Sequence, residues 1–321
     1  MSRRTEDEDE SGTTHAGAEP RLPRSLALFA AAACLGLVVA LVIVLLGSSD
    51  DGAGVAAVPS AGDPGPVHVH GLGINPADES LVLATHTGMF RLGRDARRAV
   101  RINDRYQDTM GFTVVGPDRF LGSGHPDPRD ERLPPLLGLI QSWDAGKTWA
   151  PVSLIREADF HVLRAAGSRL YGYDAANDRL LTSGDEGRVW ERMRKPAPSP
   201  IVDLVLDPGD PERLVATSAD ELAGAAFASQ DGGRSWTRLN DKAGLMAWPS
   251  STRLYLADSG GGISVSSDGG RTWSRLSDIG GVPAAFLAVE EELYVALHDG
   301  TIKRSTDGGT TWTARSGSAR S

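Results

Sequence analysis

Cysteine is nearly absent from this sequence, since Cys34 is the only one among 321 residues. A single thiol excludes any disulfide within the chain, so packing and hydrogen bonds must hold the fold together. Cys34 lies in an apolar stretch, where a lipoprotein-type processing site is one alternative. The Leu that usually stands three residues before such a cysteine is replaced here by Ala31.

Aromatic residues are also scarce, at 6% of the chain. Nearly all the tryptophans end copies of a repeated string described below, and the exceptions are Trp143 and Trp248. So few aromatic rings argue against an extended platform on which sugar rings could stack. The formal net charge of -9, with scattered Lys and Arg, excludes the basic surface expected of a nucleic-acid-binding protein.

The longest apolar segment runs without a charge from Ser25 to Leu46. It is long enough to cross about 30 Å of hydrocarbon as a helix, whereas the apolar core of a secretory signal has only about 7–15 residues. Arginines precede the segment, and Asp50 and Asp51 follow it. The positive-inside rule therefore places the N-terminus in the cytoplasm and the rest of the chain outside.

These patterns predict a single-pass protein of the cell membrane. The tail, residues 1–24, is polar and carries an acidic run, which is typical of disorder. Residues 25–46 form the transmembrane helix, which makes the membrane the first predicted partner. Residues 47–65, rich in Gly, Ala, Ser, Asp and Pro, are predicted to be a flexible linker to an extracytoplasmic domain over 66–321.

Five copies of the string Ser-x-Asp-x-Gly-x-Thr-Trp, or a close variant, occur in the C-terminal two-thirds of the chain. They recur with a period of about 40 residues, which is typical of one four-stranded propeller blade. The copies span Ser142–Trp149, Ser183–Trp190, Ser229–Trp236, Ser266–Trp273 and Ser305–Trp312. We call this string the Ser-x-Asp motif and assign one copy to each blade.

The residue types in the motif indicate a structural role. A carboxylate accepts hydrogen bonds from the backbone of a tight turn, Gly supplies the positive φ, and Trp buries a large ring between strands. We therefore predict that the five motif aspartates stabilise turns and take no part in catalysis. They are Asp144, Asp185, Asp231, Asp268 and Asp307.

Each repeat divides into four short apolar segments, and the motif falls between the third and the fourth. Residues 68–102 show the same four segments without the motif. The sequence thus predicts an all-β, six-bladed β-propeller over 66–321, preceded by a single N-terminal transmembrane helix. Whether residues 66–70 begin the first blade or complete the last one remains open.

The motif, as in Ser266, Asp268, Gly270, Thr272 and Trp273, resembles the Asp-box, or bacterial neuraminidase repeat. Sialidases, sortilin-type receptors and other propellers share this repeat. The strings 68–73, 122–126 and 158–161 further resemble bacterial extracytoplasmic Asp-box proteins labelled as sialidase-like glycosyl hydrolases. The resemblance implies a propeller fold, with glycosyl hydrolase-like activity as the expectation.

The six histidines of the predicted propeller all map to one face. In such a propeller the motif turn lies on the same face as the turn between the first and second strands. The opposite face therefore collects the starts of first strands and the ends of second strands. Starts of first strands carry His68, His70 and His161, and ends of second strands carry His86, His125 and His298.

We predict these six histidines to be ligand-binding residues around a central mouth, although each could instead simply cap a strand end. Asp108, Asp159 and Asp174 map to the same face and are the candidate catalytic carboxylates. Imidazole and carboxylate groups suit a divalent metal such as Zn²⁺, as well as general acid and base chemistry. The predicted metal ligands, from three different blades, are His70, His125 and His161.

A true sialidase is not expected. The family needs an arginine triad and a Tyr paired with a Glu, whereas Phe90-Arg91-Leu92-Gly93 matches its Arg-Ile-Pro string poorly. No Glu is obviously paired with Tyr171 or Tyr173. Two hypotheses remain: a glycosyl hydrolase-like enzyme acting on a glycan, or a non-catalytic propeller that binds a metal, a peptide or an envelope protein.

Overall fold

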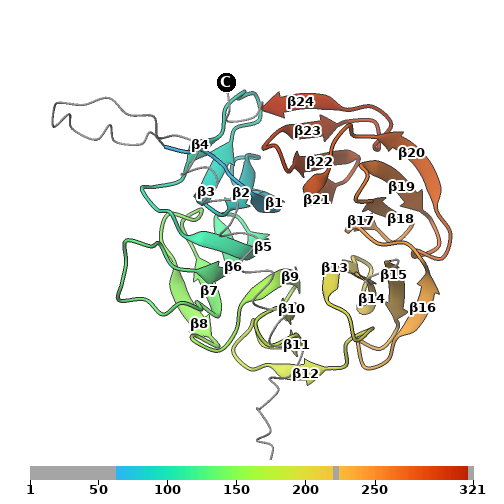
Figure 1. Cartoon of the computed structure of the whole chain (residues 1–321), viewed down its shortest axis with the longest axis horizontal. Coiled ribbons are helices and arrows are strands. Elements are labelled where there is room, and N and C mark those ends of the chain that lie inside the picture. The colour runs from blue at the N-terminus through green and yellow to red at the C-terminus, as the bar shows by residue number, and fades with distance from the viewer. Residues whose placement is uncertain (1–62, 220–223, 317–321) are drawn as a thin grey trace, which may run out of the picture. The chain divides into compact units, whose positions relative to one another are not determined.

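The computed structural model describes residues 63–219 and 224–316, which form a ring of six four-stranded antiparallel sheets (Figure 1). The predicted all-β, six-bladed propeller is confirmed. No helix in the described part of the chain is long and apolar enough to cross a membrane. The predicted tail 1–24, the transmembrane segment 25–46 and the linker up to residue 62 lie outside the described residues.

Each blade is built from one continuous stretch of chain. Blade one contains β1 (Val69–Ile74), β2 (Leu81–Thr85), β3 (Gly88–Leu92) and β4 (Val100–Arg101); blade two contains β5 (Asp108–Gly116), β6 (Arg119–His125), β7 (Leu139–Ser142) and β8 (Ala150–Ser153). Blade three contains β9 (Phe160–Ala166), β10 (Arg169–Asp174), β11 (Arg179–Ser183) and β12 (Glu191–Met193); blade four contains β13 (Ile201–Asp207), β14 (Asp210–Ser218), β15 (Ala225–Ser229) and β16 (Thr237–Asn240). Blade five contains β17 (Leu245–Ser250), β18 (Arg253–Ala257), β19 (Gly262–Ser266) and β20 (Ser274–Asp278); blade six contains β21 (Pro283–Val289), β22 (Glu292–Leu297), β23 (Ile302–Ser305) and β24 (Thr313–Ser316).

Burial changes from the inner to the outer strands of each blade. All of β2 and nearly all of β10 are buried, because neighbouring blades cover both of their faces. Their continuous apolar sequences reflect this two-sided burial. The outermost strands, such as β8 and β20, contain no buried residue. The hydrophobic core therefore lies between blades, as in the buried cluster that joins Leu121 and Leu139 of blade two to Leu163 and Leu170 of blade three.

The five Ser-x-Asp motifs form the same hydrogen-bonded turn. In blade five, the Ser266 hydroxyl donates to Asp268 Oδ1 at 2.7 Å and accepts the Gly270 N–H at 2.8 Å. Asp268 also accepts the backbone N–H and the hydroxyl of Thr272. All of these contacts fall within eight residues of sequence, so the turn is a local structure that each repeat makes for itself.

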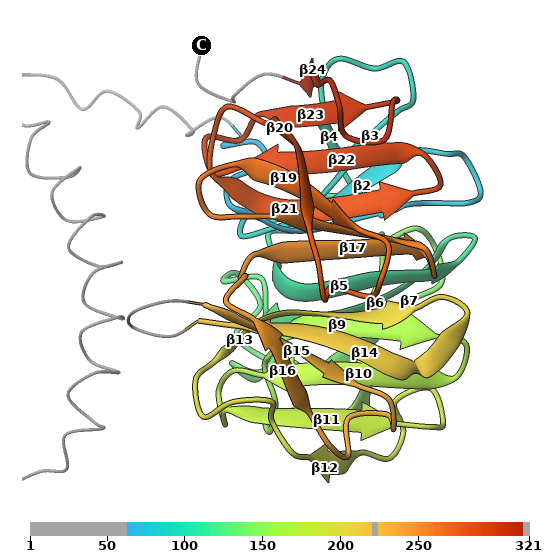
Figure 2. The same ribbon diagram turned by 90° about the vertical axis from the view of Figure 1, so that its right-hand side faces the viewer.

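In four of the five motif blades, a backbone hydrogen bond joins the motif turn to the turn between the first and second strands of the same blade, or to the start of that second strand. The Ala145 N–H donates to Asp118 O, and the Glu186 N–H donates to Ser168 O. Gly232 and Gly308 make equivalent bonds in blades four and six. The strands run between this motif face and the opposite face, which we call the histidine face (Figure 2).

Ring closure, which the sequence left open, is achieved by packing rather than by strand exchange. Strand β1 pairs with β2, so residues 69 and 70 begin blade one and do not complete blade six. A buried apolar cluster that includes Val69 and Ala296 joins these two blades. At the rim, the Arg315 side chain donates to the carbonyl oxygens of Gly93 and Arg94.

Candidate functional site

The innermost strands of the six blades surround the centre of the ring (Figure 1), and residues from all six line a central cavity of about 800 Å³. Its polar side chains at the histidine-face end come from blades one, three and four, and include His70, His161, Arg164 and Asp203. Blades five and six contribute small or apolar groups such as Ala247. The mouth is therefore polar along one arc and apolar along the other.

Irregular register near the starts of innermost strands helps to build this mouth. Register shifts occur around His70 in β1, His161 in β9 and Val202 in β13, so each of these residues is bulged out of its ladder. A bulge re-aims a side chain that regular pleating would direct elsewhere. All three bulged residues line the cavity.

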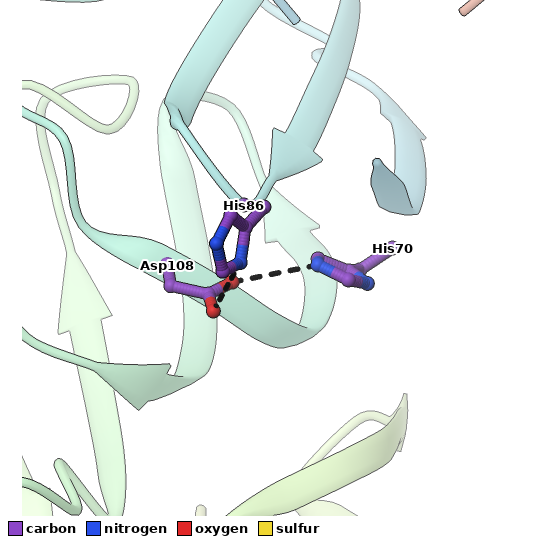
Figure 3. Close-up of side chains that lie close together, drawn as sticks. All are labelled: His70, His86 and Asp108. Atoms are coloured by element: carbon purple, nitrogen blue, oxygen red, sulfur yellow. Dashed lines mark hydrogen bonds and ion pairs between the residues drawn. The ribbon is translucent and has the colours of Figure 1, made fainter. Parts of the chain in front are cut away.

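The first polar group at the mouth consists of His70, His86 and Asp108 (Figure 3). His86 Nδ1 lies 2.7 Å from Asp108 Oδ2, and His70 Nε2 lies 3.4 Å from Asp108 Oδ1. The Asp108 side chain is 13% exposed, whereas that of His86 is 61% exposed. The carboxylate is therefore largely shielded from solvent, whereas one of the two imidazoles that contact it is open to solvent.

Backbone contacts hold this group in place. The His86 N–H donates to the carbonyl oxygens of Val67 and His68, which ties the end of β2 to the segment that precedes β1. Gly124 has a φ of +134°, and a Cβ at that position would lie 2.2 Å from Asp108 O. Only glycine tolerates both the conformation and the close approach, so Gly124 allows β6 to pass beside Asp108.

Electrostatics favour the charged carboxylate in this group. Burial raises the pKa of Asp108, but the close imidazoles of His70 and His86 outweigh it and hold that pKa below its usual value. Burial also lowers the pKa of His68, and so do the nearby His70, His86 and His298. His68 lies directly before β1 and His298 directly after β22, both exposed.

A second group, built around Asp159, lies at the next blade junction. His161 Nε2 is 2.9 Å from Asp159 Oδ2, and His125 Nε2 is 3.6 Å from the same oxygen. His125 Nδ1 lies 2.8 Å from Pro135 O, which orients its ring. Asp159 Oδ1 is buried and has no hydrogen-bond partner among the described residues.

The third predicted catalytic carboxylate, Asp174, is fully buried and fully engaged. Its Oδ1 accepts the Asp159 N–H at 3.0 Å. Its Oδ2 accepts bonds from Arg179 Nε at 2.6 Å and from Asn177 Nδ2 at 2.8 Å. Asp174 therefore supports the backbone of Asp159 and does not present a free oxygen to the mouth.

The sequence maps Asp203 to the same face, further round from the other carboxylates, but its ion pair with Arg164 was not predicted. Arg164 Nη2 lies 2.6 Å from Asp203 Oδ1, and Asp203 Oδ2 accepts the Met246 N–H from the next blade. Burial raises the pKa of Asp203, while the Arg164 charge opposes that rise. Asp203 lies near the start of an innermost strand, as Asp108 and Asp159 do. This shared position was the available signal that Asp203 belongs to the mouth.

The three predicted metal ligands do not converge. His70 contacts Asp108, whereas His125 and His161 contact Asp159 in a different blade junction. Among the described residues, one set places three candidate ligand atoms within 4.8 Å of one another, and it contains His70, His86 and Asp108. His86, predicted only as a ligand-binding residue, thus takes the place expected of His125 and His161.

Known proteins resemble this chain in fold. No family model and no curated protein sequence matches it. The GH74 xyloglucanase from Xanthomonas campestris aligns over 78% of this chain at 19% identity, with a TM-score of 0.53. A chain of a nidogen/laminin complex aligns over 73% of this chain and 91% of its own length at 13% identity, with a TM-score of 0.58.

A third structure, YCF48 bound to D1 peptide, aligns over 66% of this chain and 83% of its own length at 17% identity. Its TM-score is 0.37, too low to support any inference. This chain covers 45% of the length of the xyloglucanase. The likenesses therefore show a shared β-propeller architecture, and the activity depends on the chemistry of the site itself.

Proposed function

We propose that this protein is a membrane-anchored, extracytoplasmic bacterial propeller of the Asp-box type, and that its mouth on the histidine face binds an envelope glycan. One observation carries the proposal. Two carboxylates, the partly buried Asp108 and the buried Asp159, each contact two imidazoles at neighbouring blade junctions, at the edge of an open cavity. The apolar run from Ser25 to Leu46 supports the anchor.

The chemistry of the mouth suits a ligand rich in hydroxyl groups. A neutral imidazole offers one donor and one acceptor, a carboxylate accepts, and a guanidinium donates. All three types occur close together in the chain. The imidazole of His161 and the guanidinium of Arg164 lie on β9, and the carboxylate of Asp159 directly precedes it. A sugar hydroxyl both donates and accepts, so it can bond to each of them.

Binding is favoured over cleavage because two-carboxylate glycoside hydrolysis needs one carboxylic acid that is protonated near neutral pH. Asp174 is engaged by Arg179 and Asn177, and the histidines hold the pKa of Asp108 below its usual value. Burial raises the pKa of Asp203, but both of its oxygens are already bonded, one to Arg164 and one to the Met246 N–H. Glycosyl hydrolase-like activity is the second candidate. The observation that favours it is the buried Oδ1 of Asp159, which has no hydrogen-bond partner among the described residues and so leaves one carboxylate oxygen uncommitted at the mouth.

The test uses the full chain in detergent micelles with purified envelope polysaccharides, and it measures both binding and the release of reducing ends. We expect saturable binding that falls at least tenfold in Asp159→Asn and in Arg164→Met. An exposed aspartate at the rim, Asp95, supplies the control, and Asp95→Asn should bind normally. Release of reducing ends that Asp159→Asn abolishes would establish the hydrolase instead, and unchanged binding in both site variants would overturn the proposal.

A further inference from the structure

We propose that His70, His86 and Asp108 form a binding site for one divalent transition-metal ion, with Zn²⁺ as the representative ion. This proposal is independent of glycan binding and would survive its failure. The site bridges blades one and two, since β1 and the end of β2 supply the histidines and β5 supplies the aspartate (Figure 3).

The spacing of the three side chains fits a metal. Two ligands bound to Zn²⁺ at about 2.0–2.1 Å in tetrahedral geometry lie about 3.3 Å from each other. His70 Nε2 and Asp108 Oδ1 are 3.4 Å apart, and His86 Nδ1 approaches Asp108 Oδ2 to 2.7 Å. Candidate ligand atoms of all three residues lie within 4.8 Å of one another, so small rotations of the side chains would suffice for coordination.

Unsatisfied polar atoms give a second, independent observation. His70 Nε2 and Asp108 Oδ1 are both buried, and neither has a hydrogen-bond partner among the described residues. Buried polar atoms nearly always have a partner, and an unpartnered pair facing each other calls for an explanation. A cation between them would be bound by both atoms at once.

The ligand types also match. Two neutral imidazoles and one carboxylate are the protein ligands of several open zinc sites, in which water or substrate takes the fourth position. The His86 ring is largely exposed, so the fourth position would be reached from solvent. The ring of His68 lies 6.3 Å from that of His86 and is a further imidazole next to the site.

The Asp159 group supplies a matched comparison inside the same molecule. It also contains one carboxylate and two histidines, but its three candidate ligand atoms do not all lie within 4.8 Å of one another. His125 Nδ1 is already placed against Pro135 O. If histidines beside an aspartate were enough for binding, both groups would take up metal equally.

The experiment measures Zn²⁺ binding to the full chain in detergent, after removal of metal with a chelator, by titration calorimetry and by elemental analysis. We expect one tightly bound Zn²⁺ per chain that is lost in His86→Ala and in Asp108→Asn, with affinity falling at least 100-fold. The double variant His125→Ala/His161→Ala should keep the ion. Because His86 is exposed, its replacement should leave the fold intact, which circular dichroism would verify.

Thermal unfolding supplies a second measurement. An ion that binds only the folded state raises the melting temperature, and the rise grows with the logarithm of the free ion concentration above its dissociation constant. Zn²⁺ should therefore raise the melting temperature of the wild type and of the His125→Ala/His161→Ala variant, but not that of His86→Ala. Absence of bound Zn²⁺ in the wild type, or equal loss of Zn²⁺ in the two sets of variants, would overturn the proposal.

Discussion

His86 and Asp108 meet across a blade boundary, with Nδ1 of the histidine 2.7 Å from Oδ2 of the aspartate. The histidine follows β2 of blade one, and the aspartate begins β5 of blade two. His125 and Asp159 repeat this relationship at the next boundary, at 3.6 Å. At these two boundaries, the neighbouring blades thus contact each other on the histidine face through a carboxylate from one blade and an imidazole from the other.

The motif serine should contribute to stability through the hydrogen bonds of its hydroxyl group. Replacing Ser266 with Ala removes the acceptor for the Gly270 N–H, which is buried, and the donor to Asp268. Leaving a buried donor unpaired costs about 1–3 kcal/mol. We expect a lower free energy of unfolding by that amount in a chemical denaturation experiment.

Ser274 lies in the same blade and is exposed, so Ser274→Ala controls for the loss of a serine hydroxyl as such. Equal stability of the two variants would contradict a structural role for the motif serine.

Acid should weaken the motif turns. Hydrogen bonds from the Ser235 and Thr311 side chains and backbones lower the pKa values of Asp231 and Asp307 from 3.8 to about 2 in the folded protein. The unfolded chain therefore binds more protons between these values, so the stabilisation is present above about pH 4 and disappears as the pH falls toward 2. The measurement is the melting temperature from pH 6 to pH 2.

The variant Asp231→Asn/Asp307→Asn cannot titrate at these two positions. It should melt below the wild type at pH 6, and the gap should close near pH 2. A gap that stays constant over the whole range would show that these two carboxylates do not contribute through their charge.

Asp174 should prove structural. Asp174→Asn removes the charge that binds Arg179, and hydrogen bonds to charged groups contribute about 1.5–3 kcal/mol each. We expect a comparable loss in the free energy of unfolding, measured by chemical denaturation. The same replacement in an Arg179→Met background should cost less, because the partner charge is already gone.

Ligand binding separates this role from a catalytic one. An Asp174→Asn variant that is destabilised but still folded should bind glycan with nearly the affinity of the wild type. A variant of unchanged stability that no longer binds would instead place Asp174 in the site.

Gly124 should be intolerant of a side chain. A methyl group would contact Asp108 O at 2.2 Å, and φ is positive, so Gly124→Ala combines a clash with backbone strain. We expect a loss of about 2–4 kcal/mol in stability, and weaker Zn²⁺ binding because Asp108 must move. Chemical denaturation and calorimetry provide the two measurements.

Gly167 has a φ of +59°, and a methyl group added there would have no atom within 4 Å, so Gly167→Ala isolates the strain alone. It should cost about 1 kcal/mol and leave Zn²⁺ binding unchanged. Similar effects of the two substitutions would mean that the contact with Asp108 is unimportant.

The sequence by itself determined the number of blades and their orientation. Each Ser-x-Asp motif makes its turn from hydrogen bonds within eight residues, such as those between Ser266, Asp268 and Gly270, so one copy marks one blade wherever it occurs. Period and strand order then assign His70, His86 and His125 to strand ends opposite the motif turns, and the structure has them there.

Only the tertiary structure decided which of these side chains meet. Contacts such as His86 with Asp108, or Arg164 with Asp203, depend on how far one blade is rotated against the next and on bulges that no local pattern announces. The same long-range packing placed residues 69 and 70 in blade one. It also divided the predicted metal ligands between two blade junctions, because each carboxylate reaches only the imidazoles beside its own junction.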